Sequence, residues 1–203
     1  MQNTKELFNN QLEISGKVIE APYYTHTVQN ANNQIRYFRF KLACKRHSGA
    51  DDIVEVSIKE SLMSDIDFTK SVHIIGEIRT ANVGPQLKVY VFVNTIQNCK
   101  EGANVNFFQA TVYTCKTPNY RATPKGRRIT DLILACIRSY KNRSDYFPTI
   151  VWGRQAVEAS TLKVGTKLYI TGRLQSRNYT KNVEGVIIEK TAYEVSVIDF
   201  TVL

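Results

Sequence analysis

No hydrophobic run in this 203-residue sequence is long enough to cross a membrane as a helix. The longest apolar runs, such as VYVFV at 89–93, have the length of a single strand. The opening residues MQNTKELFNN also lack the apolar segment and the small-residue cleavage site of a secretory signal. We therefore expect no membrane spans and a location in the cytoplasm.

Cysteine and histidine are scarce, and their spacing does not predict a metal site. The four cysteines include no CxxC pair, and the three histidines cluster neither with the cysteines nor with each other. Cys44 and Cys136 each lie in an apolar run typical of a strand, where a free thiol behaves as a small hydrophobic group. We expect no metal and no cofactor.

Motifs of catalysis are also missing. The sequence contains no GxSxG, no P-loop, no zinc signature and no close pairing of His with Cys or Ser. These absences argue against an enzyme, and we expect no catalytic residues.

Acidic residues are outnumbered, and the imbalance is uneven along the chain. The formal net charge is +9 and the sequence pI is about 9.4, which favours a polyanionic partner. Residues 1–100 contain 12 Lys and Arg against 10 Asp and Glu, whereas residues 101–203 contain 15 against 8. We expect the second half to bind such a partner more strongly.

Two blocks of sequence recur in the same order. FKLACKRHSG at 40–49 resembles LILACIRSYK at 132–141, and VHIIGEIRTAN at 72–82 resembles LYITGRLQSRN at 168–178. The blocks are offset by 92 and 96 residues, as expected for a duplicated unit with loops of different length. The repeat predicts a first domain at 1–100 and a second at 105–203, joined by the polar segment CKEGANVN at 99–106.

The second unit has the pattern of a small barrel. We predict five strands, with a short helix in RQAVEASTL between the third and fourth, at 106–115, 128–140, 148–153, 166–176 and 186–199. Five strands with a helix in that place describe an OB-fold. The predicted fold is therefore all-β with a short helix per domain: two tandem five-stranded OB-fold barrels.

The fourth predicted strand alternates between two faces. Leu168, Ile170 and Leu174 share the face that we expect to be core. Gly172 shares that face, and Gly76 holds the matching position in the first unit. A residue without Cβ permits the sharp coiling that a small closed barrel needs.

Three motifs in the second unit are more specific: ITDLILACIRSY, VWGRQAVEAS and GTKLYITGRLQSRNYT. Together they resemble the bacterial single-stranded DNA-binding protein family, and the resemblance covers nearly all of residues 105–203. The first unit is similar only through KLACKR and SVHIIGEIRT. The resemblance implies a protein that binds single-stranded DNA without strong sequence preference and protects it during replication, recombination or repair.

The family stacks bases on aromatic side chains set among basic residues, which tolerates any sequence because every base has a π-face. The matching positions in this sequence are all aromatic: Tyr140, Tyr146, Trp152 and Tyr179. The three tyrosines lie in polar surroundings at strand ends and loops, which favours exposure. Trp152 lies within an apolar strand and could close the barrel instead of stacking on a base.

Basic residues are dense beside these aromatic residues. Seven fall within residues 121–143, with only Asp131 opposing them: Arg121, Lys125, Arg127, Arg128, Arg138, Lys141 and Arg143. A charge run is often a solvated face, but the interleaved tyrosines favour a nucleic-acid surface. Arg173 and Arg177 extend this surface along the fourth strand. We predict that these residues contact DNA phosphates.

The first unit differs at the equivalent loop. RHSGADDIV stands where the second unit has SYKNRSDYF, so a turn and two acids replace aromatic and basic residues. We expect Asp51 and Asp52 to lie in a solvated turn and not to bind a metal. We expect this unit to bind DNA weakly at most, or to be buried in a subunit interface.

The resemblance also bears on partners. The family commonly ends in an acidic tail that recruits replication and repair enzymes, whereas this sequence stops at YEVSVIDFTVL, so we expect no such recruitment. The family presents four barrels to one strand, which implies a homodimer of this two-barrel chain at the nucleoid. Two alternatives stay open: an OB-fold module for protein contacts, such as a replication-restart accessory, and an RNA-binding OB protein.

Overall fold

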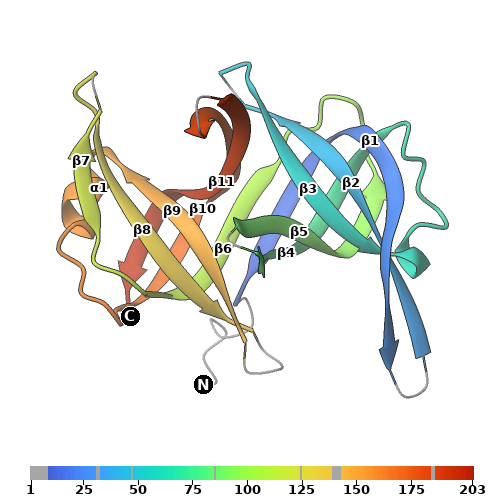
Figure 1. The fold of residues 1–203 in the computed structure, drawn as a ribbon, viewed down its shortest axis with the longest axis horizontal. Coiled ribbons are helices and arrows are strands. Elements are labelled where there is room, and N and C mark those ends of the chain that lie inside the picture. Colours follow the sequence, from blue (N-terminus) through green and yellow to red (C-terminus); the bar gives the residue numbers. More distant parts are fainter. Residues whose placement is uncertain are drawn as a thin grey trace.

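A computed structural model describes most of the chain, in seven stretches: residues 9–30, 33–46, 48–84, 86–123, 125–138, 143–183 and 186–203. These residues form mainly strands, with one short α-helix and one 3₁₀ turn (Figure 1). No helix in this part of the chain is long and apolar enough to cross a membrane. The predicted all-β class is confirmed.

Five strands form the first barrel. They are β1 (Gln11–Asn30), β2 (Asn33–Lys45), β3 (Asp51–Lys59), β4 (Ser71–Val83) and β5 (Gln86–Asn98). β1 pairs with both β2 and β4, β2 pairs with β3, and β4 pairs with β5, all antiparallel. A short parallel pairing of β3 with β5 closes the barrel. This is the connectivity of an OB-fold.

The second barrel repeats this connectivity. Its elements are β6 (Asn106–Thr114), β7 (Asn119–Ala122), β8 (Arg128–Ile137), β9 (Ser144–Trp152), α1 (Gly153–Ala159), β10 (Lys167–Val183) and β11 (Val186–Val202). β6 pairs with β8 and β10, β8 with β9, and β10 with β11, while the parallel pairing of β9 with β11 closes the barrel. The extra strand β7, which the sequence pattern did not predict, pairs with β8.

The helices of the two barrels differ. In the second barrel α1 lies between β9 and β10, as predicted, whereas the first barrel has only the 3₁₀ turn Glu60–Leu62 in the equivalent place. Downstream of that turn, the Asp67 carboxylate accepts a hydrogen bond from the Thr69 N–H at 3.0 Å and another from its hydroxyl. Such local bonds compete with the backbone bonds of a helix.

Gly76 and Gly172 lie where β4 and β10 bend. At each of them the register of the antiparallel pairing shifts. A Cβ at either position would collide with a backbone carbonyl oxygen, that of Phe92 or that of Ser196. The close approach of the neighbouring strand therefore requires glycine, in agreement with the matching positions in the sequence.

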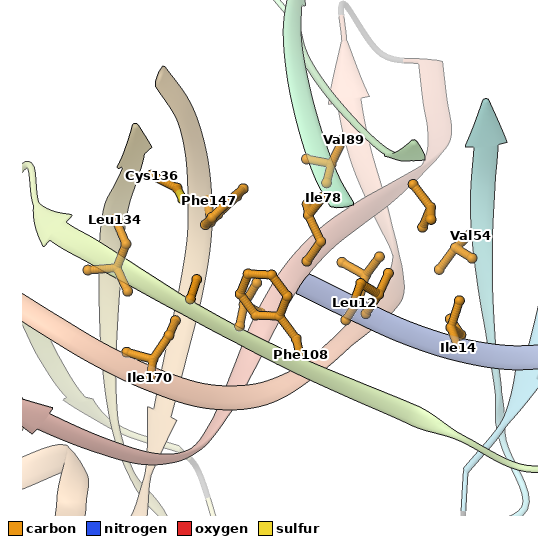
Figure 2. Packing of buried hydrophobic residues seen from close by; sticks show 14 of the residues in the cluster. Leu12, Ile14, Val54, Ile78, Val89, Phe108, Leu134, Cys136, Phe147 and Ile170 are labelled. Carbon is orange, nitrogen blue, oxygen red and sulfur yellow. The ribbon is translucent and has the colours of Figure 1, made fainter. Parts of the chain in front are cut away.

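The two barrels are joined by their first strands. β1 pairs antiparallel with β6, with Leu12 opposite Phe108, and both side chains are fully buried. Figure 2 shows Phe108 between Leu12 of the first barrel and Ile170 and Leu134 of the second. Phe108 also packs edge-on against Phe147, with ring centroids 5.6 Å apart. One hydrophobic core therefore runs through both barrels.

Candidate nucleic-acid interface

One face of β9 presents aromatic side chains to solvent. Asp145 and Phe147 are buried, whereas Tyr146 is 47% exposed and Trp152 is 37% exposed. This pattern follows from the two-residue period of a strand that covers a core. Trp152 therefore lies at the surface and does not close the barrel.

Trp152 is held by one edge of its ring. The indole Nε1 donates a hydrogen bond to the Ser196 hydroxyl on β11, at a distance of 3.2 Å. The ring is thus oriented before any ligand arrives. Ordering an aromatic contact in advance lowers the entropy lost on binding.

A groove of about 560 Å³ opens beside this tryptophan. We call it the Trp152 groove. Its lining includes five arginines and one glutamate: Arg46, Arg121, Thr123, Arg127, Ile129, Ile150, Trp152, Arg173, Gln175, Arg177, Glu194 and Ser196. An aromatic wall among arginines suits a ligand that combines flat apolar rings with negative charge.

A second hollow of about 600 Å³ shares Trp152 and Arg127 with that groove. Arg128 and Arg154 complete its charged lining. Arg154, in the first turn of α1, was missed in the sequence analysis. The available signal was its place in VWGRQ, two residues after Trp152.

A third hollow of about 810 Å³ lies between the barrels, and we call it the central groove. Arg177 and Glu194 line both this groove and the Trp152 groove. Tyr179 also lines the central groove and is 37% exposed. The Arg177 guanidinium lies 5.7 Å from the centroid of the Tyr179 ring.

Comparison with known proteins places this interface in a family. Residues 105–203 match the model of the Single-strand binding protein family. They belong to that family. The match spans all of the second barrel, including β9, β10, the strand β7 that carries Arg121 and the loop that carries Arg127.

Two curated relatives are similar to part of the chain. Single-stranded DNA-binding protein A of Bacillus subtilis (strain 168) is 34% identical over 91 residues, which are 42% of this chain and 52% of that protein. The single-stranded DNA-binding protein of Clostridium tetani (strain Massachusetts / E88) is 37% identical over 70 residues, 32% of this chain and 48% of that protein. The chain thus spans about half the length of these relatives.

Solved structures resemble the chain over both barrels. The wild-type single-stranded DNA binding protein from Thermus aquaticus matches with a TM-score of 0.73 and 17% identity, over 96% of this chain and 92% of that one. A deletion mutant of that protein matches with a TM-score of 0.70. At this identity the likeness establishes the fold, and it extends to the first barrel, which the family model does not cover.

The basic residues of the second barrel differ in the partners that they bind within the protein. Four are exposed and form no ion pair within the described stretches: Lys125, Arg127, Arg128 and Arg143. Arg121 donates two hydrogen bonds to the Asp131 carboxylate, at 2.5 and 3.1 Å, and the pair raises the pKa of the guanidinium. Because this pair is exposed to solvent it is weak, and a phosphate can replace Asp131.

Arg138 joins the two barrels. Its guanidinium donates to both oxygens of the buried Asp145 carboxylate, at 2.7 and 2.6 Å, and to the Thr80 carbonyl of the first barrel at 3.2 Å. Asp145 also accepts from Arg79 at 3.0 Å and from the Thr80 N–H at 2.6 Å. We call these four residues the Asp145 network.

The predicted phosphate contact of Arg138 does not fit this position, because its donors are turned to buried protein groups.

An equivalent network surrounds Asp52 in the first barrel. Arg46 donates to the Asp52 carboxylate at 2.8 Å and to the Ser176 carbonyl of the second barrel at 2.7 Å, and the Ser176 N–H donates to Asp52 at 2.7 Å. We call these three residues the Asp52 network. Asp52 is 1% exposed, so the expectation of a solvated turn was wrong for this residue. Burial is tolerated because the ion pair and the backbone N–H compensate the charge.

The remaining predicted residues are placed as follows. Arg173 lies half-buried in the Trp152 groove. Tyr146 shares the exposed face of β9 but lines none of the three hollows. Tyr140 and Lys141 lie outside the described residues. The described residues contain no cluster of three or more potential metal ligands.

Proposed function

We propose that this chain is a non-enzymatic protein that binds single-stranded DNA by stacking bases on aromatic side chains and holding phosphates with basic ones. The observation that supports the proposal most directly is the exposed, edge-anchored Trp152 between two arginine-lined hollows. It lies in a domain of the single-strand binding protein family. Because stacking needs only a flat base, sequence preference is weak.

The proposed contacts divide by chemistry. Trp152, Tyr146 and Tyr179 stack bases, since each presents an exposed ring. Phosphate contacts come from the basic residues that line the hollows or are exposed beside them: Arg121, Lys125, Arg127, Arg128, Arg143, Arg154, Arg173 and Arg177. The proposed role of Tyr140 rests on the sequence resemblance alone, and that of Lys141 on its place in the basic run at 121–143.

The proposal extends to organisation and place. The chain works as two OB-fold domains, residues 1–100 and 105–203, and as a homodimer that presents four barrels. A two-fold dimer is the commonest closed assembly of soluble proteins. In the cell the protein would act in the cytoplasm at the nucleoid, where replication, recombination and repair expose single strands. Sedimentation at micromolar concentration should give twice the chain mass of 23.1 kDa, and a monomer would contradict the dimer.

The single tryptophan of the chain gives a direct test of DNA binding. Adding an oligothymidine strand should quench Trp152 fluorescence, because a stacked base would lie against the indole. A duplex of the same length is the control, and RNA of the same length, added as competitor, separates DNA binding from RNA binding. Unchanged fluorescence with no retardation of the strand in a gel would refute the proposal.

A further inference from the structure

The Trp152 groove holds one carboxylate among its arginines. Glu194, which is half-buried on β11, lines the groove together with Arg121, Arg173 and Arg177. Within the stretches that the structure describes, no ion pair joins Glu194 to any of these arginines. A groove that binds only phosphates gains nothing from such a charge, because a carboxylate repels them. Phosphate binding therefore does not explain Glu194.

Neutralising the neighbouring arginines does not explain it either. The pKa of Arg46 is raised first by its hydrogen bond to Asp52, and that of Arg121 first by its hydrogen bond to Asp131. In both cases the charge of Glu194 adds least. Each of these two arginines thus has a carboxylate partner of its own, and Glu194 stands apart from both pairs.

A buried amide fixes the position of this carboxylate. Gln175 lies directly opposite Glu194 in the pairing of β10 with β11, and its Nε2 donates a hydrogen bond to Glu194 Oε1 at 2.6 Å. Gln175 is only 6% exposed. A carboxylate has about four lone-pair sites on its two oxygens, so one bond from an amide leaves most of them open. Glu194 is oriented and can still accept hydrogen bonds from a ligand.

Glu194 lies close to the residue that holds the tryptophan ring. β11 lies between β9 and β10 in the sheet (Figure 1). Ser196, whose hydroxyl accepts the hydrogen bond of the Trp152 indole, is two residues beyond Glu194 on this strand. Residues two apart in a strand share one face and lie about 7 Å from each other. A base stacked on the Trp152 ring therefore brings its edge within reach of the Glu194 carboxylate.

The first barrel lacks this polar pair. Counted from the glycine at each bend, Arg79 holds the position of Gln175, and the residue opposite Arg79 is Tyr90, where the second barrel has Glu194. Both barrels close in the same way with different residues at these two places. The fold does not require a carboxylate here, which favours a role for Glu194 at the surface of the second barrel.

The chemistry of bases suggests that role. Cytosine and adenine carry an exocyclic amino group, which donates hydrogen bonds, whereas thymine carries a carbonyl oxygen at the corresponding place on its ring. A carboxylate accepts from the amino group and is repelled by the oxygen. In a single strand this edge of the base is free, since no partner base covers it. A carboxylate beside a stacking ring can therefore distinguish cytosine from thymine.

We propose that Glu194, held by Gln175, accepts a hydrogen bond from the amino group of the base stacked on Trp152, and so favours cytosine or adenine over thymine at that position. This rests on the proposed function. The preference concerns one base of the strand, while the stacking and phosphate contacts elsewhere tolerate any sequence. The site as a whole then has a weak preference with a defined source.

The test compares oligodeoxycytidine with oligothymidine on the full chain, using strands of about 8 nucleotides that fit one barrel. The measured quantity is the ratio of the two affinities, because damage to the fold changes both alike. Glu194→Gln should lower the ratio of cytosine to thymine affinity about tenfold, since a charge-assisted hydrogen bond is lost with cytosine and a repulsion with thymine. The matched control, Glu189→Gln, removes the same charge from an exposed site on β11 outside the grooves and should leave the ratio unchanged.

Oligodeoxyuridine separates the amino group from the methyl group of thymine. It lacks the methyl group and keeps the carbonyl oxygen, so Glu194→Gln should change its affinity as it changes that of oligothymidine. A response like that of oligodeoxycytidine would assign the preference to the methyl group and overturn the proposal. An equal change for all three strands, in either direction, would overturn it too, because Glu194 would then act only through its charge or the fold. Failure of the wild-type chain to bind any of the strands would instead overturn the proposed function, and the base preference with it.

Discussion

The two barrels of this chain share their buried framework and differ on their exposed faces. Each has a buried aspartate that binds an arginine of the same barrel and the backbone of the other barrel: Asp52 with Arg46 and Ser176, and Asp145 with Arg138 and Thr80. Each also has a glycine at the bend of its fourth main strand, pressed against a neighbouring carbonyl. Both barrels retain these features because the contact between the barrels and the close approach of neighbouring strands require them.

The exposed positions carry different chemistry. Positions in the two barrels can be matched by counting from Asp52 and Asp145. Lys59, at the end of β3, then corresponds to Trp152, at the end of β9, and Ser57 corresponds to Ile150. On the closing strand, Phe92 holds the position of Ser196, which binds the tryptophan ring in the second barrel. The repeated fold thus keeps the contacts that join the barrels, while its exposed surface is free to change. The first barrel has a different aromatic surface, not an empty one.

The largest expected effect concerns the shared framework. Asp145→Ala would leave Arg79 and Arg138 without their common buried partner, and we expect a loss of about 3–5 kcal/mol in the free energy of unfolding. Asp52→Ala removes the partner of one arginine and should lie at the lower end of that range. Urea denaturation without DNA measures both. Asp131→Ala, at an exposed pair, is the control and should lose less than about 1 kcal/mol.

The next largest expected effect is on the salt dependence of DNA affinity, to which the two barrels should contribute unequally. With four to six phosphates contacted, the slope of log affinity against log salt is about −3 to −4, so affinity should fall about a hundredfold between about 50 and 200 mM salt. Arg127→Ala in the second barrel should reduce the slope by about 0.7. Arg36→Ala, at an exposed ion pair on the first barrel, should leave it unchanged. A flat salt response of the wild-type chain would contradict the electrostatic part of the proposed function.

Aromatic variants test the proposed stacking. Trp152→Ala, Tyr146→Ala and Tyr179→Ala should each weaken binding by about 1–3 kcal/mol, with similar losses for oligothymidine and mixed sequences. Tyr24→Ala removes a comparably exposed ring from the first barrel, away from the hollows, and should have little effect. Unfolding should be nearly unchanged in all four, whereas truncating a buried aromatic side chain costs about 3–5 kcal/mol of stability. Normal binding combined with early melting would mean that the rings serve the fold.

The smallest expected difference between the barrels concerns the reactivity of Cys44 and Cys136, which hold matching positions. Burial raises the pKa of the Cys44 thiol to about 11 and that of Cys136 to about 12, and the nearby Asp52 and Asp145 carboxylates act in the same direction. A raised pKa lowers the thiolate fraction at any given pH, so both thiols should resist iodoacetamide at pH 8 in the folded chain. Mass spectrometry should find the label first on the half-buried Cys99 and Cys115. Rapid labelling of Cys44 alone would show that the first barrel opens more readily.

The sequence by itself determined the all-β class, the repeat of an OB-fold pattern and the family resemblance of the second half. These follow from local period: alternation places Leu168 and Ile170 in the core, and the spacing of VWGRQ predicts the strand and the helix that follows, whereas the exposure of the Trp152 ring was left open by the sequence and decided by the fold. The sequence also selected Arg127, Arg173 and Arg177, which the fold brings to hollows beside Trp152 or Tyr179.

Tertiary structure alone decided which charged residues are joined to buried partners and which line the grooves. Arg138 and Lys125 look alike in a basic run, but Arg138 meets Thr80 of the other barrel, 58 residues away in sequence. Asp52 meets Ser176 over 124 residues, which no local pattern reveals. Lys41 and Lys88 face Arg177 across the central groove only because β1 pairs with β6 and sets the two barrels side by side. Contacts of this range depend on how the sheets close and pack, and local period carries no information about that.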